Sequence, residues 1–175
     1  MGFEYKRNLT SQIEGVVIVD ISQHKDDRGS LWTVWSEDYD CGKASEFVLD
    51  KVAVSKNNVL RGMHGDLKSH KYITVLSGKV FFAICDYRPV LSGISSSELV
   101  CESFELDGKE PRSVYLPPGV LNGHYVVSQE AVFFYKWRFK GGYPDVEDQI
   151  SVKWYDPRLK ITWPCSSPIV QKRDS

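Results

Sequence analysis

Apolar and polar residues alternate over short stretches along most of this chain, and turn-forming residues separate the stretches. Alternation with a period of two is typical of half-buried β-strands. No stretch of a dozen residues shows the 3.6-residue period of an amphipathic helix. The pattern predicts strands at residues 16–20, 29–35, 47–55, 72–76, 79–86, 98–106, 113–116, 123–127 and 131–139.

The turns between these stretches indicate the architecture. Ser77-Gly78 and residues 128–130 each separate two β-rich runs, which predicts two hairpins. Many short strands at regular spacing favour an all-β jelly-roll barrel of the cupin type, with few or no helices. No linker, internal repeat or low-complexity tract divides the sequence, so we expect a single domain over residues 1–175.

The charge balance narrows the range of partners. The chain has 175 residues, of which 22 are Lys or Arg and 23 are Asp or Glu, and its formal net charge is -1. Proteins that bind nucleic acids or anionic membranes draw their affinity from a broad basic field. This composition therefore argues against both classes of partner and leaves room for a small anionic ligand in a local basic pocket.

Targeting signals and cysteine motifs are lacking in the sequence. No apolar run approaches the roughly 20 residues that a membrane helix needs, and the N-terminus does not resemble a signal peptide, so we expect a cytoplasmic protein. Cys41, Cys85, Cys101 and Cys165 are widely scattered without a C-x-x-C pair. We therefore expect free thiols rather than a zinc site or a disulfide framework.

The densest polar cluster spans residues 61–71 and contains Arg61, His64 and Lys71. A jelly roll with a wide mouth can hold a small molecule, because alternate side chains of its strands line a cavity. Moving a proton next to a ketone needs a base, an acid on the opposite face and a donor for the enolate oxygen. His64, Tyr135 and Lys71 are candidates for these three roles, although Tyr135 is equally compatible with an aromatic core position.

A second chemistry is open to the same cluster. His64, Asp66 and the distant His124 resemble the two-histidine, one-carboxylate face that binds iron in oxygenases, so the alternative is a metal-dependent cupin-like oxygenase. Metal-binding cupins normally carry H-x-H followed by a glutamate. Here Asp66 takes the place of the second histidine, and no glutamate lies between it and Gly78. We therefore favour metal-free chemistry without a cofactor.

Several motifs, in order along nearly the whole chain, resemble the dTDP-4-dehydrorhamnose 3,5-epimerase family. The family's D-R-G, N-x-x-x-R-G-L-H and A-K-L-V-x-V-x-S-G-x-V are similar to residues 27–29, 57–64 and 70–80. Its V-x-D-L-R, P-P-G-F, L-Y-K, W-x-D-P, I-x-W-P and P-I-L-S-x-K-D are similar to residues 84–88, 117–120, 134–136, 154–157, 161–164 and 168–174. Each motif alone is weakly specific, but their shared order is highly specific.

The resemblance implies a role for each matched residue. His64 would be the general base, Asp174 its carboxylate partner, and Tyr135 the opposing acid. Lys71 would stabilise the enolate oxygen. The remaining matched residues would bind the substrate or orient the lysine: Arg28 and Arg61 on the diphosphate, and Asp86 on Lys71. The family is dimeric, so the resemblance also implies a homodimer.

Two departures from the family pattern bear on the substrate. The family's R-G-L-H-[YF]-Q appears here with Gly65 and Asp66 after the base, and its A-H-G-F appears with Asn122 and His124. Both changes resemble the GDP-linked 4-keto-heptose epimerases of bacterial capsule synthesis. A glycine beside the base would make room for a larger sugar. We therefore expect inversion of C3, C5 or both in a nucleotide-linked 4-keto sugar, with GDP-heptose favoured over the dTDP-linked sugar.

Overall fold

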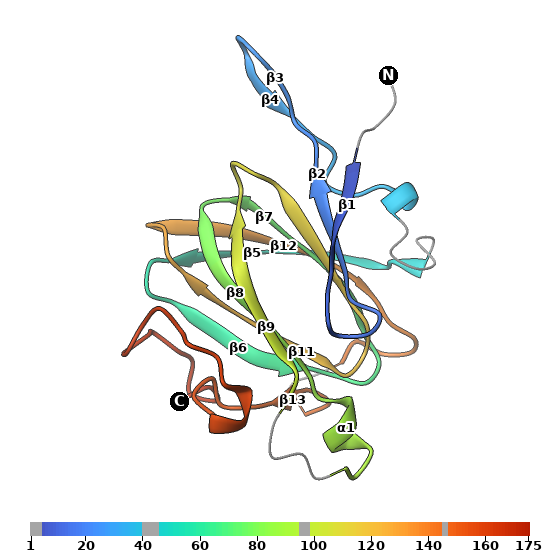
Figure 1. The fold of residues 1–175 in the computed structure, drawn as a ribbon, viewed down its shortest axis with the longest axis vertical. Helices are drawn as coiled ribbons and strands as arrows, with labels where there is room; N and C mark the ends of the chain where they lie inside the picture. The colour runs from blue at the N-terminus through green and yellow to red at the C-terminus, as the bar shows by residue number, and fades with distance from the viewer. Residues whose placement is uncertain (1–4, 40–45, 95–98, 145–146) are drawn as a thin grey trace.

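Two antiparallel sheets form the barrel, in a computed structural model that describes residues 5–39, 46–94, 99–144 and 147–175, with the backbone alone for 5–10 (Figure 1). The first sheet has the strand order β1 (Tyr5–Thr10), β2 (Val17–Ile21), β10 (Arg112–Leu116), β7 (His70–Ser77), β12 (Glu130–Arg138), β5 (Leu49–Lys56). The second has the order β13 (Ile150–Ser151), β6 (Leu60–Gly65), β11 (Val120–Val126), β8 (Lys79–Asp86), β9 (Cys101–Asp107). The predicted all-β jelly roll is confirmed.

The remaining elements are short. β3 (His24–Asp26) and β4 (Gly29–Leu31) form a two-stranded hairpin that projects from the barrel at the end opposite α1 (Arg88–Leu91) (Figure 1). Residues 29–35 were expected to form one strand, but β4 ends at Leu31 because Trp32 and Trp35 pack against a buried cluster on the first sheet. Two 3₁₀ turns, Glu37–Tyr39 and Pro157–Leu159, complete the described elements.

The two predicted hairpins are wrong. β7 and β8 follow one another across Gly78, yet β7 pairs with β10 and β12, whereas β8 pairs with β9 and β11. β11 and β12 are likewise consecutive but belong to different sheets. Both turns therefore carry the chain from one sheet to the other. Gly78 has a φ of 80°, and a Cβ there would lie 2.1 Å from the Glu130 carbonyl oxygen, so only glycine fits this corner.

Alternation within the strands separates an interior from an exterior. Between the sheets lies a buried apolar cluster that includes Ile73, Phe82, Leu106, Val126 and Phe133. A second cluster lies on the outer face of β6, β8 and β11, where the C-terminal segment covers it (Figure 1). A parallel bridge of residue 59 to residue 169 fastens that segment to the start of β6. The C-terminal segment is therefore held against the barrel beside His64.

Two further expectations concern cysteines and membranes. Cys85, Cys101 and Cys165 are free thiols, as predicted, while Cys41 lies outside the described residues. In the part of the chain that the structure describes, no helix has the length and apolar character needed to cross a bilayer.

Candidate active site

A polar cavity of about 280 Å³ opens at one end of the barrel interior. Strands from both sheets contribute to its wall, because β6 and β11 belong to one sheet and β7 and β12 to the other. The lining residues are Lys51, Arg61, His64, Lys71, Asn122, His124, Tyr135, Trp137, Tyr143, Gln149, Gln171 and Arg173. Six of the ten residues predicted for the site lie in this wall, and a seventh, Asp174, lies directly behind it.

His64 and Asp174 form a hydrogen-bonded pair, although 110 residues separate them in the chain. His64 Nε2 lies 2.6 Å from Asp174 Oδ1, and the Asp174 side chain is only 1% exposed. Burial alone would raise the pKa of Asp174. Hydrogen bonds from His64, Gln171 and the Gly62 backbone N–H outweigh burial and hold the pKa below its ordinary value. Asp174 is therefore ionised, and an ionised carboxylate can only accept hydrogen bonds.

The ionised carboxylate determines which imidazole nitrogen carries the proton. Because Asp174 accepts from Nε2, neutral His64 is protonated there and keeps its lone pair on Nδ1. Nδ1 lies 3.3 Å from a terminal nitrogen of Arg173, a residue in the cavity wall. A second terminal nitrogen of Arg173 donates to Gln149 Oε1 at 3.1 Å. The basic atom of His64 therefore faces a cation in the cavity.

Lys71 is a buried cation on β7. Its ammonium nitrogen lies 3.3 Å from Asn122 Oδ1 and 4.9 Å from the centre of the Trp137 ring. Burial lowers the pKa of Lys71 to about 8, and the nearby carboxylate of Asp66 partly opposes the shift. A lysine with a pKa near neutrality can donate to a developing oxyanion and also lose its proton within a moderate pH range.

The predicted contact of Asp86 with Lys71 is wrong. Both carboxylate oxygens of Asp86 accept from the Arg88 guanidinium, each at 2.8 Å, and the pair lies at the end of β8. Asp66 is the carboxylate that acts on Lys71 instead. It is 2% exposed, and its Oδ1 accepts the backbone N–H groups of residues 68 and 69. Asp66 therefore stands behind the cavity wall rather than in it.

Tyr135 faces His64 across the cavity, since β12 and β6 belong to opposing sheets. The ring also packs against Phe133, with the ring centres 4.7 Å apart. Burial raises the pKa of Tyr135 to about 12, and the positive charge of Arg61 partly offsets the shift. The phenol therefore keeps its proton at neutral pH and is available as a hydrogen-bond donor.

The two predicted diphosphate ligands lie in different places. Arg61 lies in the cavity wall and donates through Nε to Ser55 Oγ at 3.0 Å. The Arg28 side chain is 90% exposed on the projecting hairpin and pairs with Asp26. Arg28 does not line the cavity of its own chain, so the predicted binding of one diphosphate by Arg28 and Arg61 together is wrong within one subunit.

The residues at which this chain departs from the family pattern also lie in different places. Asn122 and His124 both line the cavity, on the inward-facing row of β11. Gly65 does not: a Cβ there would lie 2.7 Å from Leu121 Cδ2 and 3.0 Å from the Val120 carbonyl oxygen. Close packing of β6 on β11 therefore requires glycine at position 65. The expectation that Gly65 makes room for a larger sugar is wrong.

The iron site of the alternative hypothesis is not assembled. Within the residues that the structure describes, no group of three His, Cys, Asp or Glu side chains is placed to hold a metal ion. His64 Nε2 is bonded to Asp174, and Asp66 Oδ1 is occupied by backbone donors. The geometry therefore does not favour the oxygenase reading of His64, Asp66 and His124.

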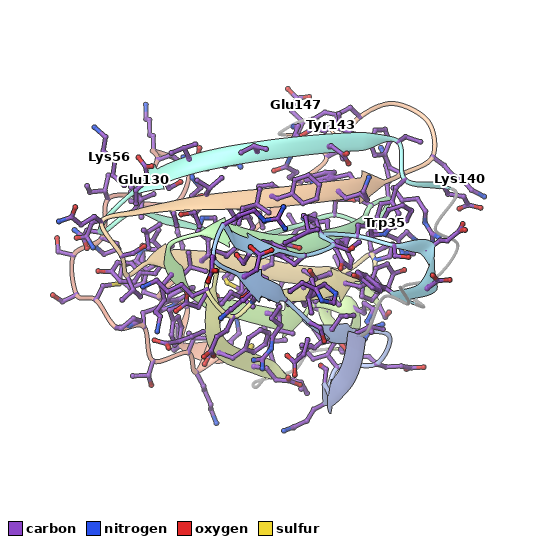
Figure 2. The ribbon with its side chains drawn as sticks, turned by 90° about the horizontal axis from the view of Figure 1, so that it is seen from above. Trp35, Lys56, Glu130, Lys140, Tyr143 and Glu147 are labelled. Atoms are coloured by element: carbon purple, nitrogen blue, oxygen red, sulfur yellow. The ribbon has the colours of Figure 1, made fainter. Side chains whose placement is uncertain are left out.

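Several cavity residues were not predicted. Trp137 and Tyr143 are aromatic residues of the cavity wall, and Lys51 lies 4.1 Å from the centre of the Tyr143 ring. Figure 2 shows Tyr143 beside β5, the strand that carries Lys51. Arg173 had a signal in the sequence, because it directly precedes Asp174 in the matched C-terminal motif. Gln171 lies in the same motif, whereas Lys51 on the edge strand β5, Trp137 near the end of β12, and Tyr143 and Gln149 beyond it lie outside the matched motifs.

Comparison with known proteins identifies the family of the chain. A family model described as dTDP-4-dehydrorhamnose 3,5-epimerase matches residues 10–175. The dTDP-4-dehydrorhamnose 3,5-epimerase of Escherichia coli K12 is 29% identical over 168 residues, 93% of this chain and 87% of that protein. The dTDP-4-dehydrorhamnose 3-epimerase of Streptomyces niveus is 31% identical over 169 residues, 93% of this chain and 78% of that protein.

Solved structures show the same likeness. The chain superposes on the dTDP-6-deoxy-D-glucose-3,5-epimerase of Legionella pneumophila, crystallised with dTDP-4-keto-L-rhamnose, with a TM-score of 0.84, 28% identity and coverage of 98% and 90%. A 4-keto-6-deoxy sugar epimerase from the novobiocin cluster of Streptomyces spheroides gives a TM-score of 0.84 and 28% identity, with coverage of 99% and 86%. The chain therefore belongs to the dTDP-4-dehydrorhamnose 3,5-epimerase family.

Proposed function

We propose that this protein is an epimerase that inverts a carbon next to the ketone of a nucleotide-linked 4-keto sugar, at C3, at C5 or at both. One observation carries the proposal: a buried carboxylate holds the His64 imidazole with its basic nitrogen toward a cavity whose opposite wall carries Tyr135. A base and an acid on opposing sheets match a reaction that removes a proton from one face of a carbon and returns one to the other.

The first step is proton abstraction by His64. Nδ1 takes the proton of the carbon next to the ketone, and the electron pair of that C–H bond moves onto the ketone oxygen to form an enolate. Asp174 stabilises the imidazolium that results, because its ionised carboxylate accepts the Nε2–H at 2.6 Å. Arg173 leaves Nδ1 when the substrate enters, since a guanidinium pairs better with an anionic group than with a neutral imidazole.

The enolate oxygen is stabilised by Lys71. Its ammonium group is buried and has one neutral partner, Asn122 Oδ1, within hydrogen-bonding distance. A cation in a site shielded from water interacts with developing charge more strongly than one in solvent. Tyr135 then donates its phenolic proton to the opposite face of the carbon, and the configuration is inverted.

The diphosphate binds at the mouth of the cavity in this proposal. Arg61, Lys51 and Arg173 all line the wall and provide positive charge within one small volume. The formal net charge of the whole chain is only -1, so this basic patch is a local feature. A small dianionic group fits such a patch, whereas a polymeric anion would require a broad basic surface.

The identity of the sugar nucleotide is the finer part of the proposal. The named relatives act on dTDP-linked sugars, whereas the sequence pattern of this chain favours a GDP-linked heptose. Asn122 and His124 support the heptose, because both line the cavity at positions where the family motif has a histidine and a phenylalanine. Gly65 does not support the heptose, since this residue packs on Leu121 outside the cavity.

We further propose a homodimer. Val52 and Val54 are 59% and 56% exposed on the outer face of the edge strand β5. The β3–β4 hairpin projects from the barrel and carries Arg28 with Leu31, which is 73% exposed (Figure 1). A second copy of the chain would cover these apolar side chains and would let Arg28 reach the substrate of the other subunit. Sedimentation equilibrium measures the oligomeric state directly, and a monomer at micromolar concentration would refute the dimer.

Proton exchange with solvent tests the reaction. GDP-linked and dTDP-linked 4-keto sugars are incubated with the protein in deuterated water and followed by NMR. Deuterium should enter at the inverted carbon of the better substrate, and His64→Asn should abolish the exchange. No exchange from any of these sugars with the unaltered protein, or full exchange with the variant, would refute the proposed function.

A further inference from the structure

His124 carries a buried polar atom that the proposed mechanism does not use. The residue is 1% exposed and lies on the inward row of β11, next to Asn122 along the cavity wall. Its Nε2 atom is buried and has no hydrogen-bond partner among the described residues. Leaving such a group unsatisfied destabilises the folded protein. Buried polar side chains are almost always paired in folded proteins, so this atom needs an explanation.

The ring of His124 is held in place by packing. It stacks on Phe133 with the ring centres 4.1 Å apart and the planes 14° from parallel. Phe133 belongs to the apolar cluster between the sheets, and it also contacts the ring of Tyr135. His124 therefore lies at the boundary of the cavity and the core, beside the proposed acid, and its orientation is fixed before any ligand enters.

The charge state of His124 restricts what it can bind. Burial lowers the pKa of His124 to about 3, and the positive charge of Arg61 and the proximity of His64 act in the same direction. The imidazole is therefore neutral at physiological pH, with one N–H group and one lone pair. It is suited neither to abstract a proton nor to pair with a phosphate. A hydroxyl group both donates and accepts, so it can bond to Nε2 in either tautomer.

The family motif narrows the choice of hydroxyl group. A hydroxyl group on the sugar ring would not distinguish this chain from its relatives, because 6-deoxy sugars also carry ring hydroxyl groups. One similar structure is named as a 4-keto-6-deoxy sugar epimerase. The family motif A-H-G-F has a phenylalanine, which offers no such polar atom, where this chain has His124. A polar atom gained at this position suits a hydroxyl group that 6-deoxy sugars lack.

We propose that His124 determines sugar specificity by hydrogen-bonding, through Nε2, a hydroxyl group on the exocyclic carbon C6 of the substrate. The inference rests on the proposed function for the presence of a 4-keto sugar in the cavity. The contact implies a substrate preference that family membership alone does not predict. The protein should prefer a sugar with a hydroxyl group on C6 over the same sugar without that hydroxyl group.

Two substrates and three variants test the inference. The substrates share one nucleotide and one ring configuration and differ only in the presence of the C6 hydroxyl group. The unaltered protein should show a kcat/KM about 10- to 100-fold higher for the hydroxylated sugar, the range expected for one buried hydrogen bond. His124→Phe should remove this preference by lowering kcat/KM for the hydroxylated sugar alone, and His124→Gln, which keeps a polar atom, should retain part of it.

Tyr125→Phe is the matched control, because Tyr125 is the next residue on β11 and its hydroxyl group bonds Asn58 outside the cavity. It should change neither substrate's kcat/KM. An equal loss with both sugars in His124→Phe would assign the residue a purely structural role, and no preference in the unaltered protein would also overturn the inference. Calorimetric binding of the two sugars measures the same preference without turnover, so failure of the proposed reaction is distinguished from failure of this contact.

Discussion

The two ends of the barrel interior are built on the same strands but have opposite character. At one end, β7, β11 and β12 present Lys71, Asn122 and Tyr135 to a water-accessible cavity. A few residues along, β7 and β11 present Val75 and Val126 to a closed apolar cluster. Inward-facing rows of β7 and β11 run from one end to the other, so the same strands carry both surfaces.

This contrast shows how a sheet scaffold supports a reactive site. At the apolar end, burial of side chains such as Phe82 stabilises the fold, because each large side chain removed from water contributes roughly 1.5–3 kcal/mol. At the polar end, burial of Lys71 works against stability, since removing its ammonium group from water lowers its pKa and disfavours the charged form. The apolar end holds the strands in the register that brings the polar groups together.

The largest effect should come from the base at the polar end. His64→Asn removes the proton acceptor while keeping a polar side chain of smaller size. We expect kcat to fall by about 10²- to 10⁴-fold, the usual contribution of a general base. The free energy of unfolding should fall by about 1–3 kcal/mol, because the buried Asp174 carboxylate loses one of its hydrogen-bond donors. Thermal unfolding and NMR exchange rates on the same samples measure both quantities.

The opposite pattern is expected at the apolar end. Phe82 is fully buried and contacts Phe104 and Phe133. Phe82→Ala should lower the free energy of unfolding by about 3–5 kcal/mol, because it leaves a cavity in the core. Activity per folded molecule at low temperature should remain within about threefold. If this variant lost activity as completely as His64→Asn does while remaining folded, the two ends would not be separable.

Tyr135→Phe should separate the two halves of the reaction. Removing the phenolic proton should lower the rate of inversion by about 10²-fold or more, while His64 continues to exchange the substrate proton with solvent. Deuterium should therefore enter the substrate without formation of the inverted sugar. Tyr125→Phe, on the outer face of β11, should leave both rates unchanged. Loss of exchange together with inversion would show that Tyr135 acts in the first step.

The smallest effect concerns pH. With a pKa of about 8, Lys71 should lose its proton as the pH rises, and kcat/KM should fall about tenfold per pH unit above 8. Lys71→Arg should move this decline to higher pH, because a guanidinium keeps its proton. The pKa of Lys71 is about 8 in the folded protein and 10.5 in the unfolded chain, so the unfolded chain binds the proton more tightly. The free energy of unfolding should therefore rise as the pH increases from 8 toward 10.5. A kcat/KM that stays constant up to pH 10 would contradict this role.

Some features of the fold and the site were predictable because they depend on local residue types. Alternation located most of the strands but missed β1, β3, β6 and β13. β6 was missed because its residues were interpreted as a polar cluster. The two hairpin predictions failed because a tight turn such as Ser77-Gly78 is compatible with a hairpin and with a corner between sheets. Which one forms depends on the strands that lie beside β7 and β8, and they come from distant parts of the chain.

By itself, the sequence determined the strand-rich pattern and the residue types able to move a proton, since side-chain chemistry and a period of two are local properties. Tertiary structure alone decided which of these residues meet. It brought Asp174 to His64 across 110 residues, placed Asp66 rather than Asp86 near Lys71, and moved Arg28 away from the cavity of its own chain. The physical reason is that pairing, burial and charge act over distances in space, and the neighbours of a side chain exist only after the sheets have packed.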